Sequence, residues 1–362
     1  MIHDPRESKT YTTLQILYTF LASLLMVYHS TQHYNISGKD LFGNFFTFGE
    51  MGEDLLFVLM GFTVFFTSWR YIEAQKGYRN FMVYTLTRIF MVYWVLIAIP
   101  GFIVWNINPH LHESIAQIGA DQWWQTFTMW FGHPRIAVIT WVLTQLVFFA
   151  LLFGLAILNR KFIYLWYAVL ALSLYNLIDR VTVAAHPFGD VTDPLFKVFS
   201  PHNLEFAFGA LVFFLYKKGY FIRYYKSFLL FAIVLIFGVG AIHSQGIHDL
   251  YNARVLTFGV AVTVLTFAVV NYAQFIDKAP DNIFVKLGEA EYIMLLIHGP
   301  ILSIVDFHFA TKYSFGWIIT LATIFGILTV SYLIRRFIEA PALGVVYNRF
   351  MDKENIITTK RG

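Results

Sequence analysis

The sequence has 362 residues, of which 58% are hydrophobic and only 13% are charged. A soluble globular domain carries roughly 25% charged residues, so this composition excludes that class. The absence of cysteine excludes disulfides, thiolate metal sites and a cysteine nucleophile. The net charge of +4 is modest, and the sequence contains no nucleic-acid-binding module, no phosphate-binding P-loop and no glycine-rich dinucleotide turn.

Long apolar stretches predict ten transmembrane helices, since a span needs about 20 mostly apolar residues. They cover residues 12–34, 51–69, 84–106, 136–158, 162–178, 200–216, 227–244, 253–273, 288–306 and 314–337. With a cytoplasmic N-terminus, 20 of the 26 Lys and Arg residues fall on the cytoplasmic side. This is a strong positive-inside bias. We therefore predict an all-α, polytopic helical bundle with both termini in the cytoplasm.

The first predicted helix carries His29, about 25 Å above its cytoplasmic start at 1.5 Å per residue. An ionisable side chain inside a span marks a functional site by default, because its desolvation is expensive. Imidazole suits general-base chemistry, since its pKa lies near neutrality. His33 lies on the same helical face. The alternative is that His29 is a buried histidine bonded to another helix and His33 an interfacial residue. A metal site would need further ligands that the pattern does not supply, so no metal is expected.

Carboxylates and an arginine mark two further predicted helices. Glu50, Glu53 and Asp54 lie at the start of the second helix. They either complement the helix dipole, or Asp54 or Glu53 orients His29 or contacts substrate. Arg88 lies near the cytoplasmic end of the third helix. It is either a positive-inside anchor or a ligand for a phosphate or carboxylate.

Polar and aromatic side chains in later helices are candidates for substrate binding, with packing or helix-end roles as the alternatives. Gly299-Pro300 follows one of them and can kink its helix and free backbone carbonyls. Together with His33, the candidates are Trp141, Gln145, His202, Glu205 and His298.

Several of these segments, in this order, resemble membrane acyltransferase family 3, whose members O-acylate carbohydrates and other hydroxyl acceptors. The similar segments are Val27-Tyr28-His29, Gly52–Phe62, Arg88-Ile89 with Tyr93, Glu291-Tyr292 through His298-Gly299-Pro300, and Glu339-Ala340-Pro341. The chain departs from the family pattern at Thr85, which stands where the family has an arginine. It also lacks the glutamate that follows Trp141-Val142-Leu143 in many members.

The resemblance implies one transmembrane acyltransferase domain over residues 1–345 and a short cytoplasmic tail over 346–362, with no fused soluble domain. It implies a bacterial cytoplasmic (inner) membrane protein that uses acyl-CoA, either acetyl-CoA or succinyl-CoA, as co-substrate, with no permanently bound cofactor. The expected donor site is Arg88, Arg79, Arg70 and Tyr93.

The acceptor, a glycan or a similar hydroxyl compound, would enter from the outer side. There His29, with Asp54 and Glu53, would act as the base or as the acyl carrier. The competing hypothesis is a multi-pass transporter or flippase for a lipid-linked or acidic solute. Transporters often contain internal repeats, and we find none here.

Overall fold

The computed structural model describes residues 5–107, 123–131, 140–182, 188, 193–244 and 253–350. Within these ranges the chain forms helices and no strand. Ten helices in them are long and apolar enough to cross a membrane, which confirms the predicted all-α, polytopic architecture. These candidate spans are Arg6–Ile36, Phe45–Ala74, Tyr78–Ile103, Thr140–Leu158, Arg160–Thr182, Pro194–Lys217, Tyr225–His243, Val255–Phe275, Glu291–Lys312 and Gly316–Phe350.

The spans are built from α-helices joined in places by short 3₁₀ or π segments. The α-helices are α1 (Pro5–Ile36), α2 (Met51–Ala74), α3 (Tyr78–Tyr93), α4 (Ile99–Ile107), α5 (Trp123–Thr128), α6 (Thr140–Leu158), α7 (Ile163–Thr182), α8 (Pro194–Val198), α9 (His202–Lys217), α10 (Tyr225–Ser244), α12 (Val260–Phe275), α13 (Ile283–Gly288), α14 (Glu291–His308), α15 (Gly316–Ile334) and α16 (Ala340–Phe350). The 3₁₀ segments are η1 (Phe42–Glu50), η5 (Arg160–Phe162) and η7 (Ala310–Lys312), and the π segments are η2 (Trp94–Ala98), η6 (Val255–Gly259) and η8 (Arg335–Glu339).

Two of the π segments come just before a proline. Pro100 follows η2, and Pro341 follows η8. Proline has no backbone N–H and its ring clashes with the carbonyl four residues earlier, so a locally widened turn lets the helix continue. As a result the last span does not end at residue 337, as predicted, but continues through α16 to Phe350. The first residues of the predicted tail thus belong to α16, and residues 351–362 lie outside the described part of the chain.

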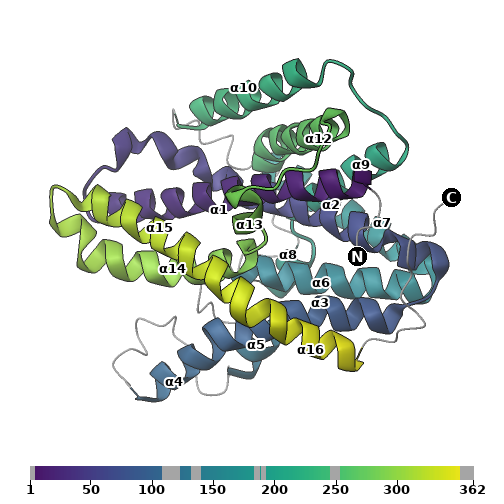
Figure 1. Cartoon of the computed structure of the whole chain (residues 1–362), viewed down its shortest axis with the longest axis horizontal. Helices are drawn as coiled ribbons and strands as arrows, with labels where there is room; N and C mark the ends of the chain where they lie inside the picture. The colour runs from purple at the N-terminus through teal and green to yellow at the C-terminus, as the bar shows by residue number, and fades with distance from the viewer. Residues whose placement is uncertain are drawn as a thin grey trace.

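The first two helices form the centre of the bundle. α1 crosses the middle of the view in Figure 1 and contacts α12, α13 and α14. α2 packs along α9, while α10 lies at the periphery on α12 and is mostly exposed. Membrane helices associate through van der Waals packing. Because neighbouring helices pack around α1, its polar side chains lie inside the protein.

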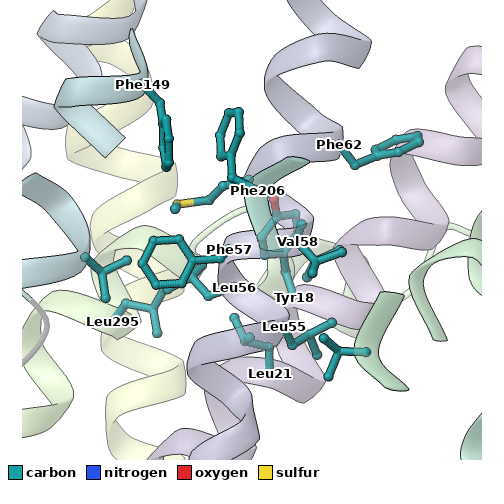
Figure 2. Packing of buried hydrophobic residues seen from close by; sticks show 14 of the residues in the cluster. Tyr18, Leu21, Leu55, Leu56, Phe57, Val58, Phe62, Phe149, Phe206 and Leu295 are labelled. Carbon is teal, nitrogen blue, oxygen red and sulfur yellow. The ribbon is translucent and has the colours of Figure 1, made fainter. Parts of the chain in front are cut away.

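The crossing of α2 and α9 depends on two glycines. A Cβ atom on Gly61 would collide with the carbonyl oxygen of Phe206, and one on Gly209 with that of Val58. Small residues at a crossing let two backbones approach closely. Beside this crossing the rings of Phe149 and Phe206 lie next to each other (Figure 2) and stack, with their centroids 3.9 Å apart. The close approach fixes the starts of α2 and α9 near each other.

Candidate active site

His29 lies against a second histidine from a distant part of the sequence. Its ring centroid is 5.1 Å from that of His298 on α14, with 36° between the ring planes. His298 is buried, and its Nδ1 lies 3.1 Å from the carbonyl oxygen of Met294, to which it donates. Within the described part of the chain, His298 Nε2 has no hydrogen-bond partner. The pair therefore places one imidazole nitrogen, His298 Nε2, in the interior without a hydrogen bond to another described protein group.

His33 is bonded to a carboxylate that the sequence analysis did not single out. His33 Nδ1 lies 3.0 Å from Asp306 Oδ2. Thr320 Oγ1 donates to Asp306 Oδ1 at 2.8 Å, and the Tyr34 hydroxyl is 3.3 Å from Thr320 Oγ1. The carboxylate is fully buried. These contacts tie the C-terminal end of α1 to α14 and α15.

Glu53 and Asp54 do not orient His29, as one of the sequence hypotheses required, but bind Arg254. Arg254 Nε donates to both Asp54 oxygens, at 3.0 and 2.9 Å, and its other nitrogens reach Glu53 Oε2 and the side chain and carbonyl of Glu50. Arg254 immediately precedes the π segment η6. The physical reason for this arrangement is that buried carboxylates need a buried cation, and a guanidinium can serve several at once.

His202 and Glu205 extend this cluster at the start of α9. His202 Nδ1 lies 2.8 Å from Glu205 Oε2, and the His202 ring lies against Phe57 at 5.1 Å and Trp141 at 5.3 Å. Side-chain oxygens or nitrogens of Asp54, His202 and Glu205 lie within 4.8 Å of one another, close enough for a metal ion. The guanidinium on Asp54 already supplies positive charge there, so the trio is better described as part of an ion network.

Arg88 lies in a second ion network near the other end of the bundle. Its Nη2 is 3.2 Å from Glu291 Oε1, and its Nε is 3.8 Å from Glu339 Oε1, while Arg335 approaches the other oxygen of Glu339 at 3.4 Å. Tyr292 also donates to the carbonyl of Ile89 at 2.8 Å. Arg88 is therefore neutralised by protein carboxylates, and an anionic ligand would have to compete with them.

Of the remaining predicted site residues, two are buried and hydrogen-bonded and two are at least partly exposed. The hydroxyl of buried Tyr93 donates to the carbonyl of Thr126 at 3.0 Å, so it helps to hold α5. Gln145 donates to the carbonyl of Lys197, and its Oε1 has no partner among the described residues. Arg79 is exposed at the start of α3, and Arg70 is half-buried on α2.

Three residues central to these networks were absent from the candidate list. They are Arg254, Asp306 and Glu339, of which only Glu339 enters the sequence analysis, as part of a family motif. The available signal was an ionisable residue at the end of a predicted span. That signal identifies a candidate but not its partner.

Comparison with known proteins identifies the family. A family model described as an acyltransferase domain matches residues 17–336. The chain belongs to acyltransferase family 3. No curated protein and no solved structure matches it. The match spans the helices that carry His29, Arg88, Arg254 and His298, and together with the ten apolar helices it makes the chain a multi-pass membrane acyltransferase.

Proposed function

We propose that this acyltransferase moves an acyl group, acetyl in the first instance, from cytoplasmic acyl-CoA to a hydroxyl of a glycan or similar acceptor at the outer side of a bacterial cytoplasmic membrane. The observation that carries the proposal is the His29–His298 pair in the bundle interior, in which His298 Nε2 has no hydrogen-bond partner among the described residues. Membership of the family favours this function over the transporter alternative.

The chemistry follows from an imidazole at that place. In direct transfer, His29 removes the proton of the acceptor hydroxyl while its oxygen attacks the thioester carbonyl carbon. The carbon–sulfur bond breaks, the CoA thiolate leaves, and the proton ends on its sulfur. In the two-step route, His29 first takes the acyl group and releases CoA, and the acceptor then attacks the acyl-imidazole. Both routes give an ester and CoA.

The donor would approach from the basic cytoplasmic side. A CoA nucleotide is highly charged and stays at that face, while its extended pantetheine arm carries the thioester between helices toward His29. Exposed Arg79 suits first contact with a phosphate, and Arg88 lies deeper, where a phosphate would replace Glu291 or Glu339 as its partner. Arg70 is the third arginine of the proposed acyl-CoA site.

The test is acyl-CoA binding followed by turnover. Thermal unfolding of the purified protein in detergent would be measured with acetyl-CoA and succinyl-CoA, with desulfo-CoA and ATP as controls. We expect saturable stabilisation by an acyl-CoA that weakens in Arg79→Gln, while the exposed Arg336→Gln behaves as wild type. His29→Ala should bind acyl-CoA but release no CoA. Full activity in folded His29→Ala, or no stabilisation by any CoA species, would contradict the proposal.

A further inference from the structure

The Asp306–His33 pair has the geometry of a histidine prepared to act as a base. Asp306 Oδ2 accepts from His33 Nδ1 at 3.0 Å, so the lone pair of the neutral ring lies on Nε2. A carboxylate in this position fixes the tautomer and stabilises the imidazolium that forms on protonation. The orientation of the carboxylate is itself fixed, since its Oδ1 accepts from Thr320 at 2.8 Å.

A purely structural tie between helices accounts poorly for this arrangement. The carboxylate of Asp306 is fully buried, which is expensive unless a partner compensates. Its ionisable partner is a histidine whose side chain keeps 14% of its surface exposed. The His33 ring also lies against Phe307, with centroids 4.8 Å apart, which restrains it further. The pair thus combines a fixed, buried carboxylate with an imidazole that solvent or a ligand can reach.

The pair also lies between His29 and the outer surface. His33 follows His29 by one helical turn, about 6 Å along the axis at 1.5 Å per residue. Next to it, Tyr34 joins Thr320 by a hydrogen bond and lines an open cavity of about 500 Å³ with Lys39, Tyr313 and Trp317. His33 does not itself line this cavity, but its chain neighbour Tyr34 does, so the cavity opens next to the His33–Asp306 pair.

We propose that His33, positioned by Asp306, is the base that removes the acceptor's proton, and that His29 carries the acyl group. This inference rests on the proposed function. In the first step the His29 nitrogen attacks the thioester carbon, the carbon–sulfur bond breaks and CoA thiolate leaves. In the second step the acceptor oxygen attacks the acyl-imidazole carbon, its proton passes to His33 Nε2, and the carbon–nitrogen bond to His29 breaks. His33 then returns the proton to solvent, where it balances the thiolate.

The two steps can be measured separately in the full chain reconstituted in lipid nanodiscs. Exchange of labelled CoA into acetyl-CoA reports the first step without any acceptor. Hydrolysis of acetyl-CoA reports the second step with water as the acceptor. Hydroxylamine reports it with a nucleophile strong enough to need no base. The variants are His33→Ala and Asp306→Asn, with His308→Ala as the matched control, because His308 is an exposed histidine on the same helix as Asp306.

We expect both variants to exchange CoA at a rate near that of the wild type and to lose hydrolysis by about 10²–10⁴-fold, the usual contribution of a general base. Hydroxylamine should restore acyl removal, and His308→Ala should match the wild type throughout. Asp306→Asn keeps the shape of the side chain, but its amide donates to Nδ1 and moves the ring proton to Nε2, so it should lose hydrolysis even where it unfolds at the wild-type temperature.

Wild-type hydrolysis in folded His33→Ala would overturn the inference. So would hydrolysis without CoA exchange in the wild type, because His29 would then not carry the acyl group. A protein that binds acetyl-CoA but neither exchanges nor hydrolyses it would overturn this inference alone. A protein that binds no acyl-CoA would overturn the proposed function as well.

Discussion

Replacement of Gly209 by alanine tests whether the close crossing of α2 and α9 holds the bundle together. In a helix interior this change is intrinsically favourable by about 1 kcal/mol. At Gly209, however, the new methyl group would meet the backbone of Val58 and Phe62 rather than a movable side chain. The two helices must therefore separate, and the side chains that interdigitate across the crossing lose contact.

The size of the effect follows from dispersion. A gap of 0.5–1 Å forfeits a quarter to a half of an attraction of ~0.1–0.2 kcal/mol per atom pair. For roughly 50 atom pairs across the crossing, the loss is about 1–5 kcal/mol, with a central value of about 3 kcal/mol. After the favourable helix term, we expect Gly209→Ala to lower the free energy of unfolding by about 2 kcal/mol.

Gly238→Ala is the matched control, because a Cβ atom there meets no atom within 4 Å. It should leave the free energy of unfolding unchanged or raise it by up to about 1 kcal/mol. The assay is equilibrium unfolding in mixed micelles with increasing SDS, followed by tryptophan fluorescence. If Gly209→Ala proves as stable as Gly238→Ala, the close approach of these helices does not stabilise the fold and the reasoning is wrong.

Two further predictions concern the ion networks. Arg254→Gln should lower the free energy of unfolding by about 3–5 kcal/mol, because it leaves buried carboxylates without their cation, whereas Lys312→Gln at an exposed position should change it little. Arg88→Gln should also destabilise the protein. Adding Glu291→Gln to that variant should recover part of the lost free energy of unfolding. If the effects of the two substitutions are simply additive, the 3.2 Å contact between these side chains contributes nothing to stability.

The helices could be predicted from the sequence because a span is a local property. Each apolar run predicts its own helix, and each of the ten predicted stretches overlaps one candidate span of the structure. The extension of the last helix was missed because Pro341 normally ends a helix, and the wider turn at Arg335–Glu339 that accommodates it has no local signature.

The partners within the site could not be predicted, because they depend on which helices touch. His29 and His298 are far apart in sequence, and their contact follows from the packing of α1 on α14. Asp54 was expected near His29, because the end of the first helix and the start of the second are close in the sequence. It instead pairs with Arg254, because the start of α2 lies against η6. Hydropathy orders residues by depth in the membrane but does not specify neighbours.

The long sequence separation within the Arg254 network has a consequence for biogenesis. Asp54 and Arg254 are 200 residues apart. At a synthesis rate of about 5–20 residues per second, the carboxylates of α2 wait roughly 10–40 s for their cation. During that time the N-terminal half of the bundle holds acidic groups that cannot yet be buried. The end of the bundle that contains Arg254 therefore closes late, when the eighth span arrives, and a nascent chain truncated before residue 254 should remain a substrate for membrane proteases.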